Sequence, residues 1–90
     1  MTQATMTAVQ PDAETAQEIQ NWMIAYLVNQ NGIGRDAIDL DKEFIDYGLD
    51  SAAALRMVGD LEDYLKRKLS PSLPYEHPTI AQLSRALAGR

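Results

Sequence analysis

The feature that most constrains the fold is a junction between loop and helix within residues 46–55. Asp50 is a favourable N-cap, because its carboxylate can accept hydrogen bonds from the amides of the first helical turn. Ser51 would then be the first helical residue, with its hydroxyl directed outward. If Ser51 were itself the cap, backbone bonding would occupy part of that hydroxyl. In either case a phosphate ester on Ser51 would be well placed, because helix amides and the helix dipole favour negative charge there.

Apolar residues at helical spacing on both sides of this junction predict three main helices and one short helix. The expected helices cover residues 12–31 or 15–31, 51–67, 73–76 and 80–88. A long loop over residues 33–49 carries apolar residues that we expect to insert into the bundle, namely Ile33, Ile38, Leu40, Phe44 and Leu49. The prediction is a small all-α four-helix bundle with its long loop between the first two helices.

The chain is expected to form one domain over residues 12–90, preceded by a tail. Residues 1–11 are rich in Thr, Ala and Gln and lack periodicity, so we predict a mobile, disordered tail there. A domain of this size buries only somewhat more than ~60% of its unfolded surface. A surface site is therefore easier to build than a deep enzymatic cleft.

Composition excludes several classes of protein. The formal net charge of −5 argues against nucleic acid and anionic membranes as partners and favours basic protein surfaces. Cysteine is absent, which excludes disulfides and thiolate metal sites. No apolar run reaches transmembrane length, and the N-terminus lacks the features of a signal peptide. We therefore expect a cytoplasmic protein, as a monomer.

Two kinds of chemistry are considered and set aside. The acidic spacing of Asp39, Asp41 and Glu43 mimics the opening of an EF-hand, but Phe44 replaces the required glycine and Asp50 replaces the bidentate glutamate. We expect a solvated acidic face and no metal site.

Catalysis by Ser51 would need a base, and His77 is the only histidine. No third orienting group is identifiable, so we interpret His77 as a structural turn residue and expect no enzymatic activity.

The second main helix has more apolar positions than one buried face needs. We expect some of Ala52, Ala53, Met57 and Val58 to be exposed and to form a docking patch beside Ser51. The alternative is a second buried face, packed against the loop or the third helix. Small residues at 52–54 could also leave a cleft between the second and third helices.

Residues 44–51 read Phe-Ile-Asp-Tyr-Gly-Leu-Asp-Ser. This run resembles the phosphopantetheine-attachment motif of acyl carrier proteins, whose core is Gly-Leu-Asp-Ser. The likeness continues through residues 59–65 and 73–80, and it covers roughly residues 13–88. Three blocks in order at the family's spacing are a far stronger signal than a four-residue motif.

The resemblance implies the carrier-protein bundle and a covalent cofactor. A separate phosphopantetheinyl transferase would attach 4′-phosphopantetheine from coenzyme A to Ser51, with the metal ion belonging to the transferase. The thiol of the arm would carry acyl groups as thioesters. Gly48 would allow the turn that lifts the serine, and Leu49 would anchor the end of the loop. Asp50 would cap the helix or contact the transferase.

The resemblance also implies partners, which are the transferase, an acyl-loading enzyme and polyketide or peptide synthase domains. The residues expected to dock them are Ala52, Ala53, Met57, Val58, Asp60, Glu62, Asp63 and Tyr75. Ala52 and Arg56 depart from the common Leu and acidic residues, which disfavours a housekeeping fatty-acid synthase.

The Asp before the serine favours polyketide-type carriers over most peptidyl ones, although aryl carriers share it. The blocks around residues 51–54, 59–62 and 75–79 are similar to carriers paired with fatty acyl-AMP ligases, which serve polyketide, lipopeptide or fatty-acyl specialised biosynthesis. An acyltransferase is the other candidate loading enzyme. The alternatives are an aryl or peptidyl carrier of a nonribosomal peptide pathway and an unmodified helical interaction domain.

Overall fold

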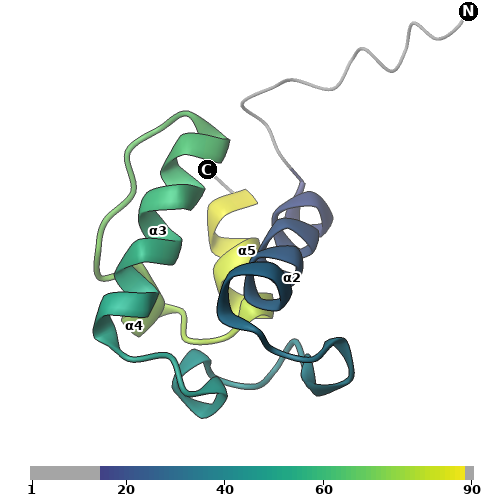
Figure 1. The fold of residues 1–90 in the computed structure, drawn as a ribbon. Coiled ribbons are helices and arrows are strands. Elements are labelled where there is room, and N and C mark those ends of the chain that lie inside the picture. Colours follow the sequence, from purple (N-terminus) through teal and green to yellow (C-terminus); the bar gives the residue numbers. More distant parts are fainter. Residues whose placement is uncertain (1–14, 89–90) are drawn as a thin grey trace, which may run out of the picture.

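The structure, a computed structural model, describes residues 15–88, and within them the chain forms four α-helices (Figure 1). These helices are α2 (Ala16–Asn31), α3 (Ser51–Leu65), the short α4 (Leu73–Glu76) and α5 (Ile80–Ala88). Two 3₁₀ turns, η1 (Arg35–Ala37) and η2 (Phe44–Tyr47), interrupt the long loop between α2 and α3. The predicted all-α bundle, with three main helices and one short one, is confirmed.

Helix α2 is capped at its start by Thr15, which forms a capping box with Glu18. The Thr15 hydroxyl accepts a hydrogen bond from the Glu18 amide at 3.1 Å, and the Thr15 amide donates to the Glu18 carboxylate at 3.0 Å. The helix ends at Gly32, whose φ of 69° is left-handed and suits a residue without Cβ. The alternative start at Asp12 and the tail predicted over residues 1–11 lie outside the described residues.

Helix α3 ends two residues earlier than predicted, at Leu65 instead of Arg67. Lys66 adopts a left-handed conformation with φ of 58°, and its amide donates to the Glu62 carbonyl at 2.7 Å. The Arg67 amide also donates to Glu62. The chain therefore leaves the helix at Lys66. The sequence around Lys66 and Arg67 contains no residue that signals this left-handed turn.

The core lies where α2, α3 and α5 meet. Its fully buried side chains include Ile19, Met23 and Leu27 of α2, Met57 and Leu61 of α3, and Ile80, Leu83 and Leu87 of α5. Phe44 and Leu49 of the long loop are buried in the same cluster, and Ile33, Ile38 and Leu40 pack against it. The prediction that the loop inserts apolar side chains into the bundle is confirmed.

The long loop is also fastened through its backbone to the segment between α4 and α5. The Phe44 amide donates to the Pro78 carbonyl at 2.9 Å, and the Ala81 amide donates to the Leu40 carbonyl at 3.0 Å. An isolated antiparallel bridge pairs Glu43 with Thr79. These contacts bring η2 beside α4, and so they set the position of the loop relative to the start of α3.

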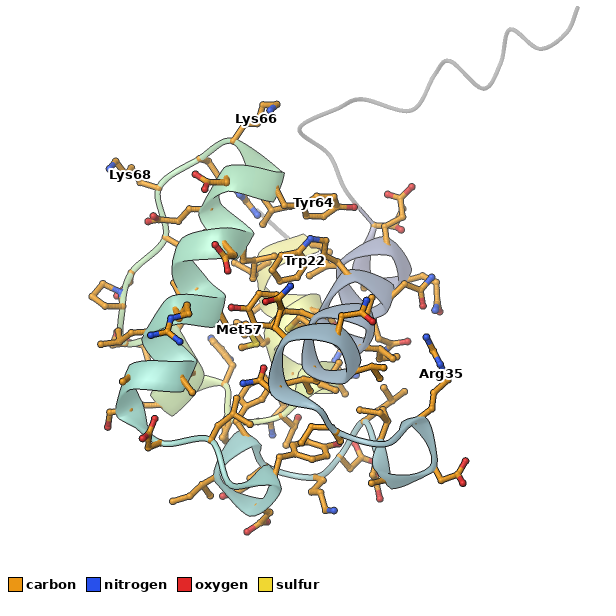
Figure 2. The ribbon with its side chains drawn as sticks, viewed as in Figure 1. Trp22, Arg35, Met57, Tyr64, Lys66 and Lys68 are labelled. Atoms are coloured by element: carbon orange, nitrogen blue, oxygen red, sulfur yellow. The ribbon has the colours of Figure 1, made fainter. Side chains whose placement is uncertain are left out.

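An aromatic stack connects α2 to α3. The ring of Trp22 lies 5.1 Å from that of Tyr26 and 5.5 Å from that of Tyr64, and Figure 2 shows Trp22 and Tyr64 between the two helices. The Tyr26 hydroxyl donates to the Asp60 carboxylate at 2.8 Å. Burial, assisted by this hydrogen bond and by the charge of Asp60, raises the pKa of Tyr26 to about 12, against a smaller lowering by Arg56.

Of the four residues among which exposure was expected, Ala52 is exposed and Ala53 is half-buried, but Met57 and Val58 are not exposed. For these two residues the alternative, a second buried face, is the correct one. Met57 is fully buried in the core, where Figure 2 shows it inside the bundle, and Val58 is 4% exposed. Ala54, one turn before Val58, is buried as well and faces the groove that α3 shares with α4. Helix α3 thus has two buried faces, because α4 packs against it in addition to the core.

None of the helices within residues 15–88 is both long enough and apolar enough to span a membrane.

Candidate functional site

Ser51 occupies the first position of α3, and Asp50 is the N-cap. The Asp50 carboxylate accepts a hydrogen bond from the Ala53 amide at 2.9 Å. Ser51 is exposed, and its Oγ accepts a hydrogen bond from the Tyr75 hydroxyl at 3.1 Å. Because Asp50 caps the helix, the Ser51 oxygen is not needed by a backbone amide. Because Oγ is the acceptor in the bond from Tyr75, the hydroxyl of Ser51 also keeps its own proton available for chemistry.

The two residues before the cap fix the end of the loop. Gly48 ends η2 with a φ of 87°, a left-handed conformation that a residue with a Cβ would adopt only with strain. Leu49 is 7% exposed and belongs to the core cluster. Its burial anchors the chain directly before Asp50, so the backbone that carries Ser51 is held in place.

A groove of about 650 Å³ opens beside Ser51. Its walls come from η2, the start of α3 and α4, and its lining residues are Glu43, Phe44, Ile45, Gly48, Leu49, Asp50, Ser51, Ala54, Pro74, Tyr75 and Pro78. Most of these side chains are apolar. The predicted cleft between the second and third helices is therefore present, but the loop forms one of its walls, and Ala54 lines it without Ala52 or Ala53.

Large apolar side chains are exposed around Ser51. They are Ile45 of η2 at 70%, Leu55 of α3 at 46% and Tyr75 of α4 at 62%. Ile45 and Tyr75 line the groove, and Leu55 follows Ser51 by one helical turn on the same face. Sequence reasoning missed Ile45 and Leu55. The four-residue spacing between Ser51 and Leu55 was the signal that could have identified Leu55.

The other predicted docking residues differ in what they contact. Ala52 is exposed next to Ser51, and Ala53 is half-buried against the core. Among the acids, Asp60 binds Tyr26, while the Glu62 carboxylate accepts a hydrogen bond from the Leu69 amide at 2.9 Å.

Asp63 is exposed, but it lies twelve residues along α3 from Ser51, or roughly 18 Å. The structure brings Tyr75 to the site and leaves the three acids at the far half of the helix.

Two kinds of chemistry were considered from the sequence, a metal site at the acids of the long loop and a catalytic pair of Ser51 with His77, and the described residues support neither. Within residues 15–88 no group of three or more acidic or histidine side chains is placed to hold a metal ion. The Asp39 carboxylate instead accepts a hydrogen bond from the Asp41 amide at 2.9 Å. His77 ends α4 through its amide, which donates to the Leu73 carbonyl at 2.8 Å, and its side chain does not line the groove of Ser51.

The groups around Ser51 fit a cofactor that is attached through a phosphate. An exposed hydroxyl at a helix N-terminus provides the point of attachment, and the helix dipole favours the negative charge of a phosphate diester. The open groove beside Ser51 leaves space for a flexible chain. Asp50 adds one negative charge nearby, but its carboxylate is turned to the Ala53 amide.

Comparison with known proteins agrees with this geometry. Residues 21–87 match the family model described as a phosphopantetheine attachment site. The chain is 38% identical over 71 residues to one component of the phenolphthiocerol/phthiocerol polyketide synthase from Mycobacterium tuberculosis, covering 79% of this chain but only 4% of that protein's length.

Two smaller proteins match over most of their own length. The acyl carrier protein TtuC from Teredinibacter turnerae is 30% identical over 76 residues, which are 84% of this chain and 87% of TtuC. The solution structure of an acyl carrier protein from Anabaena, which has a variant phosphopantetheinylation-site sequence, superposes with a TM-score of 0.77 at 37% identity and 90% coverage of both chains. This chain therefore belongs to the phosphopantetheine-binding carrier family, whose members hold 4′-phosphopantetheine as their cofactor and are not catalysts.

Proposed function

We propose that this chain is an acyl carrier protein that holds its 4′-phosphopantetheine on Ser51. The observation that carries the proposal is the exposed hydroxyl of Ser51, which stands at the mouth of the groove and is not needed as a cap because Asp50 fills that role. The thiol of the arm would form thioesters with acyl groups. Because the chain has no cysteine, that thiol would be the only one present, and loading would be unambiguous.

Attachment of the arm is a substitution at phosphorus. Ser51 Oγ forms a bond to the phosphorus of coenzyme A that bears the pantetheine, and the pyrophosphate linkage breaks. Adenosine 3′,5′-bisphosphate leaves with the electron pair, and the hydroxyl proton passes to a base of the transferase. The chain's own contribution is to position the nucleophile: Asp50 orders the first helical turn, and Leu49 holds the loop in place.

We propose the exposed apolar side chains around Ser51 as the docking surface for partner enzymes. Ile45, Leu55 and Tyr75, with Ala52 between them, would contact the transferase, the loading enzyme and the synthase domains. This set replaces Met57 and Val58, which are buried. An apolar surface of this kind, next to the attachment point, presents the arm directly to an active site that docks there.

The biosynthetic context is proposed from the relatives. The similarity to part of a polyketide synthase favours specialised polyketide or lipid biosynthesis, and the match to TtuC over most of its length favours a carrier of this size. A fatty acyl-AMP ligase or an acyltransferase is proposed as the loading enzyme. A cytoplasmic location and a monomeric state stay predictions.

The test is intact mass after incubation with coenzyme A, magnesium and a broad-specificity transferase. Wild type should gain one phosphopantetheine and Ser51→Ala none. Ser70→Ala, which removes a different exposed serine hydroxyl, should be loaded like wild type. Ser51→Ala should change the free energy of unfolding by less than about 0.5 kcal/mol, because the side chain is small and exposed. A folded, helical wild type without mass gain would favour the unmodified interaction domain.

A further inference from the structure

Tyr75 is the side chain that contacts Ser51 from another helix. Its hydroxyl donates a hydrogen bond to Ser51 Oγ at 3.1 Å, across 24 residues of sequence. Both residues line the same groove. The ring of Tyr75 is 62% exposed, so its placement is not a consequence of core packing.

The backbone under Tyr75 is well fixed. Leu73 and Pro74, the first two residues of α4, are buried, and the Tyr75 amide donates to the Ser72 carbonyl at 2.9 Å. The Ser72 hydroxyl donates to the Glu76 carboxylate at 2.7 Å across the same turn. Helix α4 therefore presents the phenol from a defined position, although the ring itself lies at the surface.

We propose that Tyr75 is a positioning residue for the hydroxyl that receives the arm, an inference that rests on the proposed function of Ser51. The phenol occupies one lone pair of Oγ and leaves the hydroxyl proton free for removal by the transferase. Once Oγ is bonded to phosphorus, it is a poorer acceptor than the anionic oxygens on that phosphorus. The phenol, which contacts Oγ, would then be placed to donate to one of these oxygens.

This change of hydrogen-bond acceptor predicts which kinetic constant of the transferase Tyr75 affects. During transfer the hydrogen bond would pass from the neutral Oγ to an anionic oxygen of the phosphoryl group, so it would strengthen toward the transition state. Such an interaction raises kcat and leaves KM nearly unchanged. The ring of Tyr75, in contrast, belongs to the proposed docking surface and should affect KM.

The contact itself is tested in the protein before modification. NMR couplings between the α and β protons of Ser51 should report one predominant rotamer in wild type and rotamer averaging in Tyr75→Phe. Tyr64→Phe is the matched control, because Tyr64 lies thirteen residues along α3 from Ser51, or roughly 20 Å. Identical couplings in wild type and Tyr75→Phe would overturn the positioning role without any transferase being involved.

The second test uses transferase kinetics and the modified protein. In Tyr75→Phe, kcat should fall about threefold to tenfold with KM unchanged, whereas Tyr75→Ala should also raise KM. Relative to the modified wild type, the ³¹P chemical shift of the phosphodiester should change in modified Tyr75→Phe and stay the same in modified Tyr64→Phe.

Equal kcat and equal ³¹P resonances in wild type and Tyr75→Phe would reject the inference and leave Ser51 modification intact. Failure of wild type to gain the arm would instead reject the proposed function, and the couplings of Ser51 would still decide whether Tyr75 orders the hydroxyl.

Discussion

The two ends of α3 are held in opposite ways. The end near Lys66 is fastened by hydrogen bonds to other segments, formed by the pairs Tyr26–Asp60, Leu69–Glu62 and Arg67–Leu87. Leu61 and Leu65 are buried there, and Tyr64 stacks on Trp22. At the other end, Ser51 is exposed, and the local polar contacts are the Asp50 cap and the bond from Tyr75.

This difference shows how one helix serves both stability and recognition. Exposed hydrogen bonds can be exchanged for bonds to water or a partner at small net cost, whereas buried apolar contacts cannot. The far half of α3 therefore fixes the orientation of the helix, and the near half keeps groups available at the surface. Substitutions in each half should separate the two roles.

The largest effect is expected from Leu61→Ala in the far half. Leu61 is fully buried, so its truncation should lower the free energy of unfolding by about 2–5 kcal/mol through lost burial and the cavity left behind. Leu55→Ala, the same change at a residue that is 46% exposed, should cost less than about 1 kcal/mol. Urea denaturation measures both, and equal losses would contradict the division of α3 into two halves.

A smaller effect is expected from Tyr26→Phe, which removes the hydrogen bond to Asp60. The loss at neutral pH should be about 1–2 kcal/mol, because the bond is to a carboxylate but Asp60 remains accessible to water.

The same variant makes a prediction about pH. Because the pKa of Tyr26 is raised to about 12 in the folded protein, the neutral phenol stabilises the fold. That contribution is complete below the unfolded pKa of about 10 and is lost as pH rises toward the folded value. Wild type should thus lose stability between pH 10 and about 12 more steeply than Tyr26→Phe, as measured by denaturation across that range. Parallel curves would show that Tyr26 does not titrate differently on unfolding.

The smallest of these effects is expected at Asp50. Asp50→Ala removes the cap and should cost about 1 kcal/mol, whereas Asp50→Asn should stay near wild type because asparagine caps equally well. Thermal denaturation gives the stability, and transferase assays on Asp50→Asn address the second proposed role. A stable Asp50→Asn that is modified slowly would assign the carboxylate to the transferase contact, and normal modification would leave only the cap.

Local features of this chain could be predicted from sequence. The predicted Asp50 cap is confirmed, and the capping box at Thr15 and the left-handed Gly32 likewise depend only on neighbours a few residues away. The insertion of loop residues such as Phe44 and Leu49 was also predictable, because isolated apolar residues in a polar loop need a place to be buried.

Features that depend on how distant segments meet could not be predicted. The sequence left open whether Met57 and Val58 are exposed or form a second buried face. That choice, the exposure of Ile45 and the contact of Tyr75 with Ser51 all follow from the position of α4 beside α3 and the loop. A short helix of four residues has too little pattern to indicate which side it packs on. Ser84 of α5 is buried although it is polar, because its hydroxyl donates to the Ala81 carbonyl, a local bond that satisfies it without solvent.

The backbone ties between the long loop and the α4–α5 segment have a consequence for variation. Peptide groups are the same whichever side chain they carry, so the bonds from Phe44 to Pro78 and from Ala81 to Leu40 survive most substitutions other than proline at the two donors. The exposed side chains of the loop can therefore be substituted without a change in its backbone conformation. Carriers on one such frame can diverge in the charge they show to their enzymes without having to evolve a new fold.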